Sequence, residues 1–152
     1  MSLVIVEERP DSPDAQQLIG ELDTHLESFP YPSESRHAFS VEKLLSDAVV
    51  FFVMRFDAEP VACCGLKLFG KEYGEVKRMY VREGYRGRGF GKAMLDHLAT
   101  YALQNGVSLL RLETGIYQKE AIGLYERYGF QRRSPFGEYR IDPMSVYFEK
   151  LI

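Results

Sequence analysis

The sequence predicts a single α/β domain in which a mixed sheet is flanked by helices. Apolar, β-branched runs typical of strands are joined by segments with helical spacing, and helices are interposed late in the chain, which indicates a mixed α/β sheet. The 152 residues, 45% of them hydrophobic, contain no internal repeat, low-complexity tract or linker. We therefore expect one domain spanning residues 1–152.

The first half of the chain predicts strands and two helices. Ser12 followed by Pro13 is typical of a helix N-cap with proline at the first helical position. Ser40 is a second candidate N-cap. The expected elements are a strand at 3–6, a helix from 13 that fades near 28, a loop at 29–40, a short helix at 41–45, and hairpin strands at 49–56 and 61–69 joined through residues 57–60.

The second half predicts alternating strands and helices. A strand at 75–81 is followed by a helix that stops at Asn105-Gly106. Its expected buried stripe consists of Met94, Leu95, Leu98, Ala102 and Leu103. Further elements are a strand at 109–113, a helix at 119–128 that ends at Gly129, and a last strand at 145–150.

Composition limits the function classes. A formal net charge of −3 and a pI near 5.7 provide no broad basic face for nucleic acid. Cys63 and Cys64 are adjacent within an apolar run, which favours buried core cysteines over disulfides, metal ligands or an acylated thiol. The histidines at 25, 37 and 97 show no metal-ligand spacing. We expect a cytoplasmic protein with no metal, no membrane segment and no nucleic-acid partner.

Residues 82–92 form a glycine-rich segment that follows a strand and opens a helix. Glycines let the backbone approach a ligand, and the free N–H groups of a helix N-terminus favour an anion such as phosphate. The spacing is wrong for two common phosphate loops. Lys92 stands where a dinucleotide fingerprint needs its third glycine, and Ala93 stands where a Walker loop needs serine or threonine.

Two motifs resemble a known family. Residues 86–91, Arg-x-x-Gly-x-Gly after a strand ending in Met79-Tyr80-Val81, resemble motif A of the Gcn5-related N-acetyltransferases (GNAT). Residues 121–130, which end in Gly129-Phe130, resemble the later Ala-Ile-x-Leu-Tyr motif of that superfamily. The resemblance covers residues 49–130. It implies the GNAT fold, with a mixed, mostly antiparallel central sheet, and acetyl-CoA-dependent N-acetyltransferase activity.

The resemblance also implies the site for acetyl-CoA, the donor substrate. The pyrophosphate would bind the backbone amides of Arg86, Gly87, Arg88, Gly89, Phe90 and Gly91. The strand that ends at Val81 would pair with the pantetheine arm, and an amide of Met79 or Tyr80 would face the thioester carbonyl and stabilise an oxyanion. Gln118 stands where many relatives have asparagine near the pantetheine, so this contact is left open. Tyr125 matches the tyrosine that protonates the departing thiolate.

A general base is also needed, because an amine acceptor is mostly protonated at neutral pH. Glu75 lies six residues before Val81, the spacing at which the histone-acetylating branch places its glutamate. Even spacing keeps both residues on one face of a strand unless a bulge intervenes. The alternative for Glu75 is a solvated residue at the start of a strand, and Glu113 is a rival base.

The acceptor pocket is expected in regions that the motifs do not cover. Aromatic and basic candidates occur in two loops: Phe29, Tyr31, Arg36 and His37 in the first, and Phe136, Tyr139 and Arg140 in the second. An arginine there would suit an acceptor carboxylate, as in an amino acid or peptide. We expect direct acetyl transfer to a primary amine of a small molecule, amino acid or peptide in a ternary complex. The alternative is a non-catalytic acyl-CoA-binding regulatory module, and family analogy is compatible with a homodimer.

Overall fold

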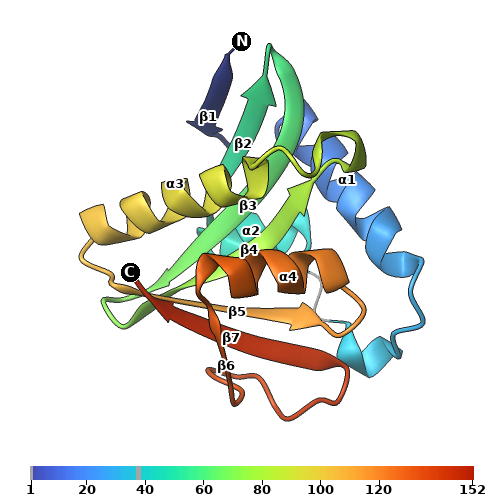
Figure 1. The fold of residues 1–152 in the computed structure, drawn as a ribbon, viewed down its shortest axis with the longest axis vertical. Helices are drawn as coiled ribbons and strands as arrows, with labels where there is room; N and C mark the ends of the chain where they lie inside the picture. The colour runs from blue at the N-terminus through green and yellow to red at the C-terminus, as the bar shows by residue number, and fades with distance from the viewer. Residues whose placement is uncertain (1, 37–38) are drawn as a thin grey trace.

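The computed structural model describes residues 2–36 and 39–152, and within them one seven-stranded sheet (Figure 1). The strands are ordered β1-β2-β3-β4-β5-β7-β6. Their bounds are β1 Leu3–Glu7, β2 Val50–Phe56, β3 Glu59–Phe69, β4 Tyr73–Val81, β5 Leu109–Gly115, β6 Gln131–Arg133 and β7 Ser145–Leu151. Neighbouring strands run antiparallel except β4 and β5, which are parallel. The predicted mixed, mostly antiparallel sheet is therefore confirmed.

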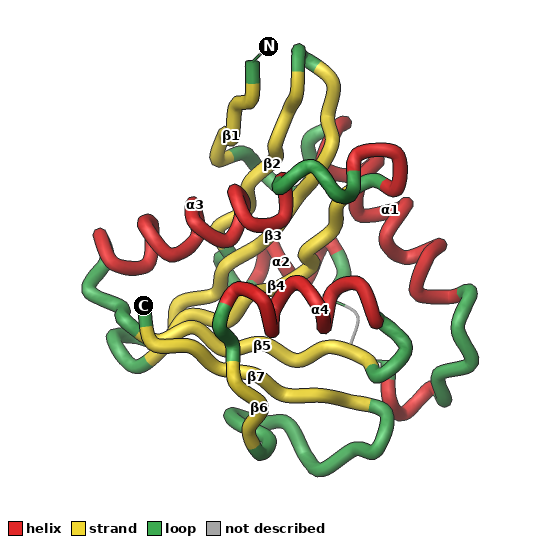
Figure 2. The backbone as a smooth tube through the Cα atoms, viewed as in Figure 1, coloured by secondary structure: helices red, strands yellow, loops and turns green. Residues whose placement is uncertain are grey.

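Helices cover both faces of the sheet (Figure 2). α1 (Pro13–Glu27) and α2 (Val41–Ser46) pack on one face, and α3 (Phe90–Gln104) and α4 (Lys119–Tyr128) pack on the other. Two short 3₁₀ turns, η1 (Ser33–Ser35) and η2 (Glu83–Tyr85), lie in the connections. Both predicted N-caps are confirmed: the Ser12 hydroxyl accepts from the Ala15 N–H at 3.2 Å, and the Ser40 hydroxyl accepts from the Lys43 N–H at 3.1 Å.

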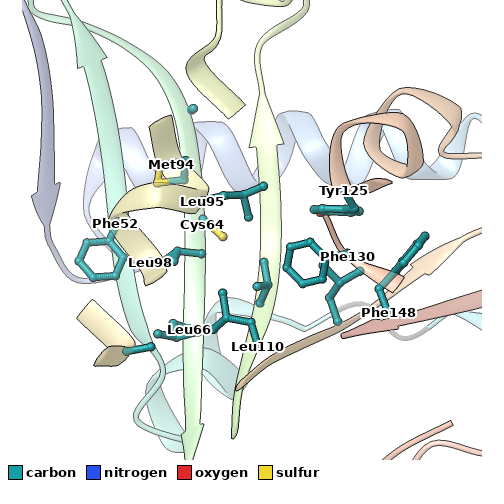
Figure 3. Packing of buried hydrophobic residues seen from close by; sticks show 14 of the residues in the cluster. Phe52, Cys64, Leu66, Met94, Leu95, Leu98, Leu110, Tyr125, Phe130 and Phe148 are labelled. Atoms are coloured by element: carbon teal, nitrogen blue, oxygen red, sulfur yellow. The ribbon is translucent and has the colours of Figure 1, made fainter. Parts of the chain in front are cut away.

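The larger core lies between the sheet and the α3–α4 pair. Figure 3 shows Met94, Leu95 and Leu98 of α3 directed at the sheet, with Tyr125 of α4 beside Phe130 and Phe148. Because this layer joins α3 to α4, the loop that opens α3 and the residues of α4 are held in one rigid frame.

Three local expectations were wrong. Leu103 is 50% exposed, because nine residues at about 100° each turn it to the opposite side of α3 from Met94. β6 was not expected, since its polar residues carry no strand pattern and it forms only by pairing with β7. The β2–β3 turn is also tighter than expected, with Asp57 and Ala58 at positive φ and Pro60 already inside β3.

Candidate active site

The loop at residues 86–91 presents backbone at the start of α3. Gly87 (φ 78°) and Gly89 (φ 81°) adopt left-handed conformations that glycine tolerates best. Gly89 is the N-cap of α3 and, having no side chain, accepts no bond from the first turn. Since the first N–H groups of a helix lack partners within it, this end of α3 has free donors and a positive dipole. Phe90 is buried and anchors the first turn in the core.

Arg86 of this loop bonds back to the protein, whereas Arg88 is exposed. Arg86 Nε donates to the Val81 carbonyl at 2.9 Å, and Nη1 donates to Glu120 on α4 at 3.1 Å. The Arg88 guanidinium lies 5.3 Å from the centroid of the Tyr85 ring. Arg86 therefore braces the loop against the end of β4 and the start of α4. The Arg86 guanidinium is therefore already engaged, whereas the backbone N–H groups at the start of α3 lack partners within the helix.

β4 and β5 separate after Glu75, before β4 reaches this loop. They pair only at two positions, Gly74 with Leu110 and Glu75 with Arg111. Beyond them β4 carries a bulge at Arg78, which has φ 53° and coincides with a register shift against β3. A bulge increases twist and bends a strand. The end of β4 thus turns away from β5, as Figure 1 shows.

The bulge also reverses the expected facing of two residues. Val81 and Met79 pack against the α3–α4 core, whereas Glu75 lies on the opposite face, where its neighbour across the strand is Lys67. The expectation that Glu75 and Val81 share a face was therefore wrong. The cause is the extra residue at Arg78, which shifts the alternation by one. Tyr80 packs on the α1 side.

The separation of β4 from β5 holds a cavity of about 250 Å³, here called the inner cavity. It is lined by β4 from Glu75 to Met79, by β5 through Glu113 and Gly115, and by Gln118 and Tyr125 of the α4 region. Tyr80 and Val81 are not among its lining residues. The structure thus brings Glu75, Met79, Gln118 and Tyr125 together around one space, and residues 86–91 are not among its lining residues.

Tyr125 is a buried phenol on the α4 side of the inner cavity. Tyr125 is 5% exposed, and its ring lies against Phe130 and Phe148. Burial, together with the nearby Cys64 and Glu113, raises the pKa of Tyr125 well above its ordinary range. The phenol therefore keeps its proton at neutral pH.

Glu75 is held in a closed polar triangle. Its Oε2 accepts from the Tyr139 hydroxyl at 2.6 Å and lies 2.8 Å from Lys77 Nζ, which itself donates to Tyr139 at 3.2 Å. Glu75 is only 3% exposed, so it is not the solvated residue that the alternative reading expected. Burial and the Glu75 charge raise the pKa of Tyr139, which therefore stays a donor. Lys77 therefore gives the buried Glu75 carboxylate an ion-pair partner inside the protein.

A second, larger cavity opens on the other side of this triangle. Its volume is about 1090 Å³, and it is here called the outer cavity. It is bounded by residues 137–144, by η1 and by the α2, β3 and β4 residues that surround Phe39. Glu75, Lys77 and Tyr139 line both cavities and form the wall between them.

The predicted acceptor loops contribute unequally to these cavities. Tyr139 and Arg140 line the outer cavity, whereas Phe136 is buried in an aromatic cluster with Tyr73 and Tyr147. Arg36 lines the inner cavity and donates to the Phe29 carbonyl at 3.3 Å. The prediction for His37 falls outside the described residues.

Gln118 is bound to the first loop. Its amide Nε2 donates to the Tyr31 hydroxyl at 3.2 Å, and its Oε1 lies 3.2 Å from His25 Nε2. Tyr31 also accepts from the Tyr117 N–H at 3.0 Å. A Cβ added at Gly115 would come within 2.1 Å of the Tyr31 hydroxyl, so glycine is needed for this close approach. Gln118 therefore joins the inner cavity to the first acceptor loop.

The remaining candidates are one carboxylate that lines the inner cavity and three side chains that pack within the fold. The rival base Glu113 lines the inner cavity and accepts from the Ser145 hydroxyl at 2.7 Å. Cys63 and Cys64 are fully buried free thiols, and burial raises the pKa of Cys63 to about 12. His97 packs edge-on against Phe52, and burial lowers its pKa.

Two absences concern the described part of the chain. Residues 2–36 and 39–152 contain no group of three or more His, Cys, Asp and Glu placed to hold a metal ion. Within the same residues, no helix has both the length and the apolar content that crossing a membrane requires.

Lys77 and Arg78 are the site residues that sequence reasoning missed. Lys77 follows Glu75 by two positions on a strand, and this spacing could have indicated an ion pair on one face. Arg78 pairs with Asp23 of α1, and its Nε is buried without a hydrogen-bond partner. No local signal in the sequence distinguishes Arg78 as the site of the bulge.

Known proteins share both sequence and fold with this chain. The family model for the acetyltransferase (GNAT) family matches residues 17–130. An IAA acetyltransferase of Azospirillum brasilense is 39% identical over 150 residues, which cover 98% of this chain and 97% of that protein.

Solved structures are similar over nearly the full length. A Klebsiella pneumoniae protein assigned as an acyl-CoA N-acyltransferase has a TM-score of 0.82 and 33% identity, with 98% of this chain and 97% of that chain covered. A GNAT family acetyltransferase of Elizabethkingia anophelis, crystallised with acetyl-CoA bound, has a TM-score of 0.73 at 18% identity, with 99% and 98% of the two chains covered. The second likeness concerns the fold alone.

Proposed function

Because this chain belongs to the GNAT acetyltransferase family, we propose that it transfers the acetyl group of acetyl-CoA directly to a primary amine in a ternary complex. One observation supports this most strongly. A single cavity between β4 and β5 is lined by a proton donor, Tyr125, and by a carboxylate, Glu75. Direct transfer needs both functions on opposite sides of one reacting carbon.

The donor half of the proposal rests on backbone groups. The N-terminal turn of α3 and the left-handed glycines before it would hold the pyrophosphate. Beyond the two paired positions, β4 lies beside the inner cavity without β5 alongside, so its backbone can pair with the pantetheine arm. The Met79 amide would lie near the thioester and stabilise the oxyanion. Gln118 would line the inner cavity beside the pantetheine arm.

Tyr125 is assigned as the general acid. The amine lone pair forms the new C–N bond, the C–S bond breaks, and the sulfur departs with the electron pair. The Tyr125 phenol, which is protonated at neutral pH, gives its proton to that sulfur. The acetylated nitrogen then releases its extra proton to solvent, from which Tyr125 regains the proton that it donates.

Glu75 is assigned as the base. It receives the proton that the ammonium of the acceptor loses, directly or through water. Tyr139 and Lys77 hold its Oε2 in place at the wall between the cavities. An amine that enters through the outer cavity therefore meets Glu75 before it reaches the thioester.

The proposal is tested by incubating the purified chain with acetyl-CoA and a panel of primary amines, and by measuring both CoA release and the mass of the acetylated product. CoA release that requires an amine, with one acetyl gained per CoA, is expected. Tight CoA binding with no release for any amine would instead indicate the non-catalytic binding module. A burst of CoA release before amine is added, with acetylated protein, would replace direct transfer by a covalent intermediate.

A further inference from the structure

The outer cavity has a wall of three lysines, and the proposed acetyl transfer uses only Lys77, which holds Glu75. Three ammonium groups surround the Phe39 ring: Lys77 at 4.3 Å, Lys43 at 5.6 Å and Lys67 at 5.9 Å from its centroid. Lys67 also lies 4.8 Å from the centroid of Phe69. The lysines come from α2, β3 and β4, so only the tertiary structure gathers them. They are here called the lysine wall.

The lysine wall holds more positive charge than its own partners neutralise. Lys43 and Lys67 share one carboxylate oxygen, Asp47 Oδ2, at 3.3 and 3.0 Å. Lys77 is paired with Glu75. Three cations therefore face two anions, and the excess positive charge lies between Lys43 and Lys67, beside aromatic rings. The Lys67 side chain is 27% exposed and the Lys43 side chain 55%.

The other charges that line the outer cavity belong to different elements and are more exposed. They are Glu34 on η1, and Glu138, Arg140 and Asp142 on residues 137–144. Glu34, Glu138 and Arg140 are exposed, so solvent and salt screen them. Asp142 already accepts from the Ser35 hydroxyl at 3.1 Å and the Met144 N–H at 2.9 Å. Over the described lining of the outer cavity, five carboxylates face four cations, so the excess of positive charge is local to the lysine wall.

We infer that the lysine wall binds a carboxylate carried by the acceptor, so that the acceptor is a small amine that also bears a carboxyl group. The inference rests on the proposed function and names the substrate class of the same site. Lys67 and Lys43 would donate to the carboxylate, and the aromatic rings of Phe39, Phe69 and Tyr73 would contact the apolar part of the molecule. The amine would then extend past Tyr139 towards Glu75. The carboxylate recognition expected of Arg36 or Arg140 is thus assigned to lysines.

The first experiment compares matched compounds on the wild-type protein in the presence of CoA. Each L-amino acid of a panel is compared with its carboxamide and with the amine that lacks the carboxyl group, by calorimetric binding and by CoA release with acetyl-CoA. The acid is expected to bind about tenfold or more tightly than its amide, since a hydrogen bond to a charged group adds about 1.5 kcal/mol or more. Equal binding across all matched sets overturns the inference, whether or not acetyl transfer occurs.

The second experiment uses variants with opposite expected signs. Lys67→Gln should raise the KM of the carboxylate acceptor about tenfold and leave the KM of its amide unchanged. Asp47→Asn removes the anion that competes for Lys43 and Lys67, so it should lower the KM of the acid. Lys71→Gln is the matched control, because Lys71 bonds the Asn105 carbonyl outside both cavities.

The outcomes separate the two proposals. If amines are acetylated without regard to a carboxylate, or if Lys67→Gln and Lys71→Gln behave alike, the lysine wall does not bind the acceptor and the acetyltransferase proposal still stands. If the acids bind at the lysine wall and no CoA is released, the proposed function fails and the carboxylate site remains.

Discussion

The loop at residues 86–91 and the lining of the outer cavity differ in the groups that form them. The loop consists of backbone donors set by left-handed glycines and by the start of α3, within six consecutive residues. The outer-cavity lining includes side chains from α2, β3, β4 and residues 137–144. A backbone site tolerates few changes in sequence, whereas a side-chain site can be re-specified residue by residue.

The strongest test of the proposed donor and acceptor sides is at Tyr125, which lines the inner cavity on the proposed donor side. Tyr125→Phe should lower kcat by about 10²-fold, the usual contribution of a general acid, and should leave CoA affinity nearly unchanged. The matched control is Tyr128→Phe on the same helix, whose hydroxyl donates to Asp96 at 2.7 Å away from the inner cavity. Equal kcat values for the two variants would remove Tyr125 from the mechanism.

A nearly equal effect is expected on the acceptor side. Glu75→Gln should lower kcat/KM about 10²-fold at neutral pH without changing CoA affinity. The loss should shrink as pH rises, because solvent then supplies more of the deprotonated amine that Glu75 otherwise produces. Rate profiles from pH 6 to 10 measure this, with Glu72→Gln, an exposed glutamate in the preceding turn, as control. A deficit that is constant across that range would show that another group is the base.

A smaller effect on the donor side should appear in binding alone. Gly89→Ala forces a side chain into a left-handed conformation, which costs about 1–2 kcal/mol, and should raise the Kd of CoA about tenfold. A Cβ there meets no atom within 4 Å, so packing is not the cause. Gly84→Ala is the control, since Gly84 lies outside the left-handed region and its Cβ also meets nothing. Calorimetric titration with CoA distinguishes them, and identical Kd values would argue against a backbone phosphate site.

The smallest effect concerns the link between α1 and the end of β4. Glu21 accepts from Arg82 at 2.9 and 2.8 Å, and these bonds lower the pKa of Glu21 below its ordinary 4.5. The pair therefore stabilises the fold above pH 4.5, and this stabilisation is lost as pH falls through the lowered pKa. Glu21→Gln should reduce the free energy of unfolding by at most about 1 kcal/mol at pH 7, because the pair is partly exposed.

Urea denaturation at pH 7 and pH 3 would measure the Glu21 effect. The wild-type and variant curves should converge in acid, with Glu72→Gln again as the control for a lost carboxylate. A difference that persists unchanged at pH 3 would assign the effect to packing instead of the ion pair.

Much of the donor side was predictable because its signals are local. Left-handed turns require glycine at particular positions, helix ends require caps, and the residues concerned are neighbours in the chain. The glycine loop, the Ser12 and Ser40 caps, the position of Tyr125 near the end of a helix and the family itself could therefore be read from short motifs.

The tertiary structure decided the remainder. Whether Glu75 shares a face with Val81 depends on the bulge at Arg78. The polar contacts of the buried Glu75 depend on Tyr139, which lies 64 residues further along the chain. The lysine wall likewise depends on the packing of α2 against β3 and β4. Such contacts depend on strand register and loop packing, which side-chain identity alone does not specify. The amino-acid sequence by itself thus determined the family and the glycine loop that is proposed to hold the acyl donor. Only the fold decided which side chains line the proposed acceptor side, because those side chains come from distant segments of the chain.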